Sequence, residues 1–239
     1  MTVWRDLLLF IDINLHFLNL LIVIYLMRST TASYHRKFNL AVALTFITAL
    51  SLIVASIVIG KNDFFLLLNV DLGTLFDYFF RFWTNLGDGI VWVMVAILFF
   101  IYHKKKFPLL IATFMLSTLF TQITKHFIFS ETLRPTAAIA NFQMIHTVPG
   151  VELLSANSFP SGHTATAFCI FLLTSILVKN NWVVAIGFIC ALLVGYSRIY
   201  LAQHFPIDVG GGMITAVICL LISLAIQKRW DEKNQPQRT

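Results

Sequence analysis

The feature of this sequence that most constrains its fold is a succession of apolar segments, each close in length to the thickness of a bilayer. A helix needs about 20 apolar residues to cross the hydrocarbon core of a membrane. Charged residues make up only 12% of the 239 residues, whereas a soluble domain carries about 25%. The sequence therefore predicts an all-α, polytopic transmembrane helical bundle. The predicted spans are residues 7–27, 40–60, 86–102, 107–127, 164–178, 182–200 and 207–226.

Basic residues cluster in the loops between these spans. Such residues favour the cytoplasmic side of a membrane, and this rule places the N-terminus outside and the C-terminus inside. The same clustering accounts for the formal net charge of +6 without a nucleic-acid partner, which would need a continuous basic stripe. The clusters predicted to face the cytoplasm are residues 28–37, Lys104–Lys106, Lys179, and Lys228 with Arg229.

Residues 61–85, between two of the predicted spans, are too polar to cross a bilayer. Large apolar side chains recur there at helical spacing, with Asp77 and Arg81 among them. This pattern is typical of an amphipathic helix that lies in the membrane interface. Two roles fit such a helix equally well: a lid or packing element, and a platform beside an entrance for lipid. The apolar positions are Leu72, Leu75, Phe76, Phe79, Phe80 and Trp83.

The chain divides into three parts on this basis. We expect residues 1–37 to form an extra N-terminal transmembrane segment and a basic cytoplasmic loop. Residues 38–227 would form a core of six transmembrane helices. Residues 228–239 would form a polar cytoplasmic tail, whose composition predicts disorder.

Three clusters of polar residues fall at the same predicted face of the membrane. The first contains Lys125 and Arg134, the second is residues 160–163, and the third runs from Ser197 to Asp208. Each of these residues taken alone has an ordinary explanation, as an interfacial anchor or a charge at a helix end. Their convergence on one face favours a binding site.

The residue types in these clusters are those that bind phosphate. Lys125, Arg134 and Arg198 would supply positive donors for phosphate oxygens, and the planar arginine fork binds two oxygens at once. Ser161 and Gly162 begin a predicted helix, where backbone N–H groups favour an anion. The Ser161 hydroxyl would add a further donor.

Two histidines and an aspartate provide groups for attack and for proton transfer. A helix that starts at Pro206, a favoured first position, puts Asp208 in its first turn, four residues after His204. The carboxylate would hold one imidazole nitrogen of His204 and orient the other as a nucleophile. His163 would then act as general acid and base. The glycines at 210–212 would let a neighbouring helix approach closely.

Two motifs in these clusters are specific to one family. The sequence contains Pro-Ser-Gly-His at 160–163, and Ser-Arg, five residues, His, three residues, Asp at 197–208. Over about residues 40–226 the chain thus resembles the type 2 phosphatidic acid phosphatases, or lipid phosphate phosphatases, which share their site with vanadium haloperoxidases. The resemblance implies that His204 forms a phosphohistidine, that Asp208 orients it and that His163 protonates the leaving group. It also implies that no metal or other cofactor is needed, and that phosphate is bound by Lys125, Arg134, Ser161, Gly162 and Arg198.

The first motif departs from the family pattern of Lys, six residues and Arg-Pro. Eight residues separate Lys125 from Arg134 here, and the position with the family spacing is Phe127, which cannot replace a lysine. We expect the two extra residues to loop out within 129–132. His126 is an alternative to Lys125 for the first position of the motif.

The sequence and the resemblance together predict a multi-pass phosphatase of a bacterial-type inner (plasma) membrane, with its site on the outer, periplasmic face. Its partners would be the bilayer and a lipid phosphate or diphosphate substrate. Candidate substrates are undecaprenyl diphosphate, phosphatidylglycerol phosphate, phosphatidic acid and lipid A phosphate. Two alternatives are a haloperoxidase-like use of the same pocket and a non-catalytic lipid-binding or transport protein.

Overall fold

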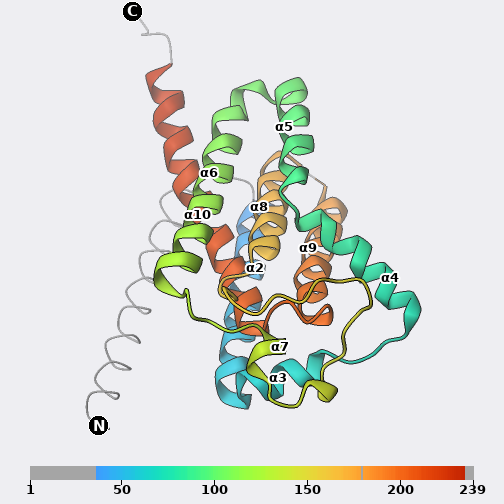
Figure 1. Ribbon diagram of the computed structural model, residues 1–239. Coiled ribbons are helices and arrows are strands. Elements are labelled where there is room, and N and C mark those ends of the chain that lie inside the picture. Colours follow the sequence, from blue (N-terminus) through green and yellow to red (C-terminus); the bar gives the residue numbers. More distant parts are fainter. Residues whose placement is uncertain (1–35, 179, 235–239) are drawn as a thin grey trace, which may run out of the picture.

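The computed structural model describes residues 36–178 and 180–234 (Figure 1). Every regular element in this part of the chain is helical, as predicted. The predicted span at 7–27 and Lys179 lie outside the described residues. The α-helices are α2 (Arg36–Ile59), α3 (Lys61–Leu68), α4 (Thr74–Trp83), α5 (Ile90–Tyr102), α6 (Phe107–Ile123), α7 (Pro135–Ala138), α8 (Gly162–Leu177), α9 (Asn181–Tyr200) and α10 (Pro206–Lys233).

Four predicted spans are confirmed as helices that are long and apolar enough to cross a membrane. These are α2, α9, α10, and α6 together with the short turns at its two ends, Lys104–Ile128. The remaining two predicted spans among the described residues, which contain α5 and α8, are shorter. α8 has 16 residues, and α5 has 13.

The predicted start of the span at 86–102 is wrong. Gly87 and Gly89 flank Asp88 at this point, and glycine is the poorest helix former other than proline. The chain therefore forms a 3₁₀ turn at Thr84–Gly87, and α5 begins only at Ile90. The helical segment Thr74–Gly87 and α5 meet the requirements for a span only as one pair, bent by 53°.

The predicted amphipathic segment at 61–85 is two helices, α3 and α4, and not one. Gly73 adopts a φ of 89° immediately before α4, a conformation that glycine takes without steric cost. Within α4, Phe80 is 3% exposed against the core, whereas Leu75 and Phe82 are 77% and 71% exposed. The exposed apolar side chains suit a helix in the membrane interface.

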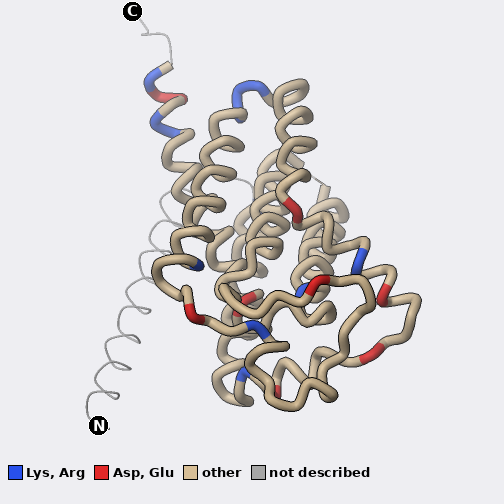
Figure 2. The backbone as a smooth tube through the Cα atoms, in the orientation of Figure 1, with Lys and Arg blue, Asp and Glu red and all other residues tan. Residues whose placement is uncertain are grey.

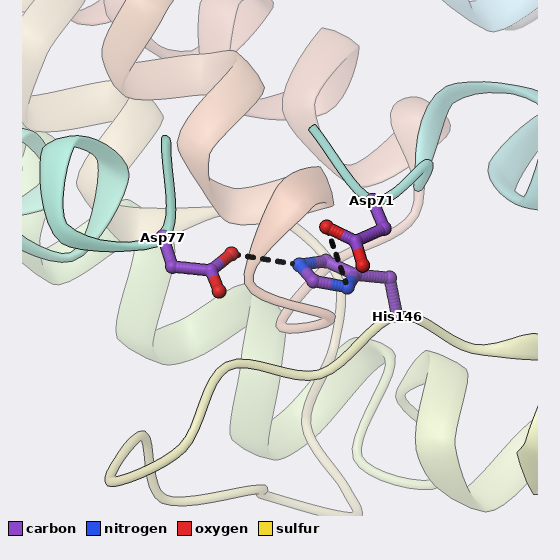
Figure 3. Close-up of side chains that lie close together, drawn as sticks. All are labelled: Asp71, Asp77 and His146. Atoms are coloured by element: carbon purple, nitrogen blue, oxygen red, sulfur yellow. Dashed lines mark hydrogen bonds and ion pairs between the residues drawn. The ribbon is translucent and has the colours of Figure 1, made fainter. Parts of the chain in front are cut away.

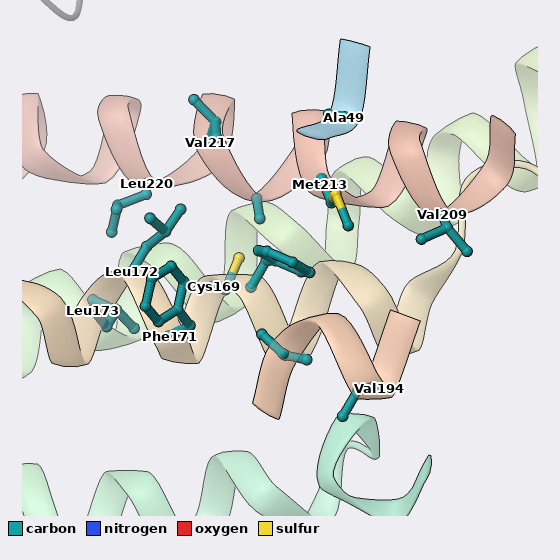
Figure 4. Packing of buried hydrophobic residues seen from close by; sticks show 14 of the residues in the cluster. Ala49, Cys169, Phe171, Leu172, Leu173, Val194, Val209, Met213, Val217 and Leu220 are labelled. Carbon is teal, nitrogen blue, oxygen red and sulfur yellow. The ribbon is translucent and has the colours of Figure 1, made fainter. Parts of the chain in front are cut away.

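α10 lies at the centre of the bundle. In its most apolar 18-residue window, 72% of the residues are buried, against 22% in α2. Figure 4 shows Val209, Met213, Val217 and Leu220 along α10, with Leu172 of α8 facing Leu220. This packing fixes α10 along its length, so that its first turn is held at the start of α8.

Three consecutive glycines near the start of α10 allow three different neighbours to approach. A Cβ atom on Gly210 would lie 2.9 Å from a backbone oxygen of α2. A Cβ on Gly211 would overlap the ring of Phe159, and one on Gly212 would lie 2.5 Å from the carbonyl oxygen of Ser161. The predicted close approach to a neighbouring helix is therefore found, and it includes the loop that leads into α8.

Gly212→Ala is expected to lower the melting temperature of the protein in detergent. The new Cβ would meet backbone of α8, which cannot move away as a flexible side chain can. Overpacking of this kind costs about 1–3 kcal/mol. Gly89→Ala is the matched control, since a Cβ there meets nothing within 4 Å. Equal melting temperatures for wild type and Gly212→Ala would contradict the close approach.

Charged residues gather at the two ends of the bundle (Figure 2). At one end, the loop Lys104–Lys106 lies beside the last turns of α10. Nε2 of Gln227 donates a hydrogen bond to the carbonyl of Lys105 at 3.1 Å, and Nζ of Lys106 is 3.8 Å from Oδ2 of Asp231. These contacts place two of the predicted cytoplasmic basic clusters at the same end.

α10 is longer than predicted. The helix continues to Lys233, so the prediction of disorder is wrong for residues 228–233. The side chain of Gln227 donates to Oδ1 of Asp231 at 2.6 Å, one helical turn further on. Side-chain pairs at this spacing stabilise a helix. Residues 235–239 lie outside the described residues.

Candidate active site

The turn between α9 and α10 holds the third predicted cluster. Ala202 adopts a left-handed backbone conformation with a φ of 54°, which ends a helix by turning the chain back. The backbone N–H groups of Gln203 and His204 then donate to the carbonyl of Arg198 at 2.9 and 3.0 Å. The backbone itself therefore holds His204 next to Arg198.

Asp208 lies in the first turn of α10, as predicted. Its Oδ2 atom accepts hydrogen bonds from the N–H of Phe205 at 2.9 Å and from Oγ of Ser158 at 2.5 Å. Nδ1 of His204 is 3.5 Å from the same oxygen and has no hydrogen-bond partner among the described residues. With a proton on Nδ1, this N–H group lies beside the Asp208 carboxylate, and the Nε2 atom of His204 carries a lone pair.

The start of α8 is joined to α10 through Ser161. The Ser161 hydroxyl oxygen caps α8 by accepting from the N–H and the hydroxyl of Thr164 at 3.4 and 2.8 Å. The backbone N–H of Ser161 donates to the carbonyl of Asp208 at 2.9 Å, so it is not free for an anion as the sequence suggested. Gly162 and His163 follow in the first turn, where backbone N–H groups lack a carbonyl partner within the helix. Those N–H groups and the Ser161 hydroxyl proton are the donors available to an anion.

Arg134 links the loop before α8 to the turn that carries His204. Its Nε atom donates to the carbonyl of Ala156 at 2.9 Å, and its Nη1 atom donates to the carbonyl and Oε1 of Gln203 at 2.9 and 3.3 Å. Burial lowers the pKa of Arg134 from its usual value, while the charge of Asp208 raises it. Because a guanidinium stays protonated in proteins, this side chain contributes a fixed positive charge.

Arg198 brings a second guanidinium to the site from the last turn of α9. Its Nη1 atom donates to Oγ1 of Thr84 at 2.7 Å. Its Nε atom is buried and has no hydrogen-bond partner among the described residues. A buried N–H without an acceptor is costly, and a phosphate oxygen is the kind of acceptor that would satisfy it.

A wide helical turn accommodates the longer spacing of the first motif. Residues Thr124–Ile128 form a π-type turn. Part of the two-residue extra length between Lys125 and Arg134 is therefore taken up in this turn, and not all of it within residues 129–132. Lys125 is half-buried in this turn, and the charge of Arg134 acts on it, whereas His126 is exposed. Of the two candidates, Lys125 is therefore the less exposed side chain, and it stays our prediction for the first position of the motif.

The charges of the predicted site residues and burial act together on the pKa of His204, whose side chain is 2% exposed. Its pKa is held well below the usual range, first by burial, then by the positive charges of Arg134 and Arg198, and further by Lys125 and His163. The imidazole is therefore neutral at neutral pH. A neutral imidazole is the form that can act as a nucleophile.

A second group of polar side chains, Asp71, Asp77 and His146, fastens the loop before α8 (Figure 3). Nε2 of His146 lies 3.0 Å from Oδ1 of Asp77, and its Nδ1 lies 3.9 Å from Oδ1 of Asp71. Tyr200 donates to the same oxygen of Asp77 at 2.7 Å, and Asn69 accepts from the backbone N–H of His146 at 2.8 Å. Asp71, Asp77 and His146 are residue types that bind metals, and one potential ligand atom of each lies within 4.8 Å of those of the other two. Because each ring nitrogen already faces a carboxylate, the group serves as a clamp between this loop, α4 and the end of α9.

Comparison with known proteins identifies the family. Residues 106–232, more than half of the chain, match the model described as the PAP2 superfamily. The chain belongs to the PAP2 superfamily. The undecaprenyl-diphosphatase of Sulfolobus acidocaldarius is 27% identical over 172 residues, which are 71% of this chain and 80% of that protein. The lipid A 4'-phosphatase of Porphyromonas gingivalis is 28% identical over 186 residues, covering 71% and 75%.

Among solved structures, the crystal structure of Aquifex aeolicus LpxE is similar to this PAP2 protein. The TM-score is 0.59 and the sequence identity 36%, over 67% of this chain and 92% of that chain. Membership of the superfamily confirms the resemblance seen in the motifs. The protein is an all-helical, multi-pass membrane phosphatase.

Proposed function

We propose that this PAP2 phosphatase hydrolyses a lipid phosphate or diphosphate through a covalent phosphohistidine at His204. The observation that carries the proposal is a buried imidazole whose Nδ1 lies 3.5 Å from the Asp208 carboxylate, with positive side chains whose charges lower its pKa. In the first step, Nε2 of His204 attacks the phosphorus atom, and the bond from phosphorus to the leaving oxygen breaks. Asp208 stabilises the positive charge that develops on the imidazole ring.

His163, in the protonated form that a bound phosphate anion favours, supplies the proton that the leaving oxygen needs and becomes neutral. In the second step, the neutral His163 takes a proton from a water molecule, and the water oxygen attacks the phosphohistidine. Inorganic phosphate leaves and His204 is regenerated. The phosphate oxygens are held during both steps by positive charges and N–H or O–H donors. These come from Lys125, Arg134, Ser161, Gly162 and Arg198.

A lipid substrate suits the position of the site at the ends of the apolar helices. The acyl or polyprenyl chain remains in the bilayer while the phosphate head group enters between α8, α9 and α10. The two relatives named for undecaprenyl diphosphate and for lipid A support this substrate class. The substrate that we propose therefore has a hydrophobic tail attached to a terminal phosphate.

We place the site on the outer face of the inner membrane. Lys104–Lys106 and the end of α10 lie together, and such basic clusters favour the cytoplasmic side. Asp208 begins α10 and Lys125 lies at the other end of α6. The proposed site is therefore at the end of the bundle away from these clusters.

A panel of lipid phosphates and diphosphates, assayed for phosphate release with the purified protein in detergent, tests the proposal. We expect turnover of at least one substrate, inhibition by orthovanadate, and no loss of activity with chelators. Phosphate release that requires an added divalent metal would contradict the mechanism. If a lipid of the panel binds to the protein but no member of the panel releases phosphate, the protein would instead be a non-catalytic lipid-binding protein.

Ser158→Ala is expected to lower kcat about tenfold, with little change in KM. The substitution removes a buried hydrogen bond to Oδ2 of Asp208, and a bond to a charged group is worth about 1.5–3 kcal/mol. The carboxylate would then be held less firmly beside His204. Steady-state kinetics measures the effect, with Ser175→Ala as control because that hydroxyl is also buried but bonds within α8. An unchanged kcat for Ser158→Ala would contradict this role.

A further inference from the structure

The turn Thr84–Gly87 between α4 and α5 contacts two of the helices that carry the site. Thr84 is buried, and its hydroxyl oxygen accepts from Nη1 of Arg198, on α9, at 2.7 Å. A Cβ atom on Gly87 would lie 2.7 Å from the carbonyl oxygen of His163, on α8, and 2.8 Å from a methyl of Val194. The turn is therefore packed tightly between the segments that present His163 and Arg198.

The hydrogen bond to Thr84 leaves part of the Arg198 guanidinium free for a ligand. A guanidinium has five N–H donors in one fixed plane. Among the described residues, Thr84 is the side chain that hydrogen-bonds this group, while the buried Nε has no partner. Fixing Nη1 sets the plane of the whole group and thereby the direction of the Nε–H bond.

The backbone supports this geometry from the other side. The carbonyl of Arg198 accepts from the N–H groups of Gln203 and His204, so the main chain of Arg198 is tied to the turn that carries His204. Thr84 holds the far end of the same side chain. Arg198 is thus fixed at both ends, as a group that must meet a small anion requires.

We propose that Thr84, which lies outside all three sequence motifs, is a positioning residue that orients Arg198 for the phosphate group. The inference rests on the proposed function, because it assigns Arg198 to phosphate binding.

Thr84→Val tests the role, because valine keeps the shape of threonine and removes the acceptor. We expect the inhibition constant for orthovanadate to rise about tenfold and kcat/KM to fall by about the same factor. Thr84→Ser keeps the hydroxyl and should restore most of both values. Thr113→Val is the matched control, since the Thr113 hydroxyl is fully buried but bonds to the carbonyl of Leu109 within α6. This variant should match wild type in both measurements.

Two results would overturn the inference. One is a Thr84→Val protein with wild-type vanadate inhibition and kcat/KM. The other is a Thr84→Ser protein as impaired as Thr84→Val, since the loss would then follow the side-chain packing and not the hydroxyl. If the wild type releases no phosphate, the proposed function fails, and calorimetric titration of wild type and Thr84→Val with inorganic phosphate decides the inference separately. Equal phosphate affinities in that titration would overturn it.

Discussion

His204→Gln is expected to lower phosphate release by about 10⁴-fold or more, because the loss of a nucleophile removes the covalent route altogether. Glutamine is close to histidine in size, and backbone hydrogen bonds to the carbonyl of Arg198 hold the turn between α9 and α10, so this turn should keep its structure. Its amide nitrogen cannot attack phosphorus. Phosphate release from a lipid phosphate in detergent, measured at equal protein concentration, reports the loss. The melting temperature should remain close to that of wild type.

His103→Gln is the control for this experiment. His103 lies between α5 and α6 beside the Lys104–Lys106 turn, at the end of the bundle away from the proposed site. The activity of the His103→Gln protein should equal that of wild type. Substantial turnover by a folded His204→Gln protein would show that another group attacks the phosphate, and the assignment of the nucleophile would be wrong.

His163→Gln is expected to have a large effect that depends on the leaving group. A lipid alcohol is a poor leaving group and needs a proton, so its release should slow by about 10²–10⁴-fold. The p-nitrophenolate ion leaves without a proton. With p-nitrophenyl phosphate, the first step should therefore stay fast in the variant while hydrolysis of the phosphohistidine becomes slow.

Rapid-mixing kinetics separates these two steps. The His163→Gln protein should release a burst of p-nitrophenol equal to the amount of enzyme, followed by slow turnover. The His204→Gln protein should give no burst and serves as the reference. If His163→Gln slows the lipid substrate and the p-nitrophenol burst by the same factor, His163 does not act as the general acid.

Much of the fold could be predicted because a bilayer imposes its thickness on each helix. α2, α6, α9 and α10 follow directly from runs of apolar residues. The start of α5 was predicted four residues too early, since Gly87, Asp88 and Gly89 interrupt both the helical and the apolar pattern before Ile90. The extension of α10 to Lys233 was missed because a helix can continue beyond the apolar segment when polar side chains pair along it.

The proximity of the candidate site residues within each of two motifs could be predicted, because each motif lies in one short stretch of chain. Arg198, His204 and Asp208 are brought together by a helix end, a left-handed Ala202 and a new helix start. The hydrogen bonds of Ser158 and Thr84 could not be predicted in the same way. Ser158 bonds to a carboxylate 50 residues away, and Thr84 to a guanidinium 114 residues away. Only the packing of the helices brings these groups into contact.

Direct detection of the covalent intermediate is the most decisive measurement for this account. The wild-type protein is mixed with its lipid substrate, quenched in alkali, in which phosphohistidine is stable, and digested for mass spectrometry. We expect one phosphate group on the peptide that contains His204, and none in His204→Gln or after preincubation with orthovanadate. Turnover of the substrate with phosphate found on no residue, or on a residue other than His204, would contradict it.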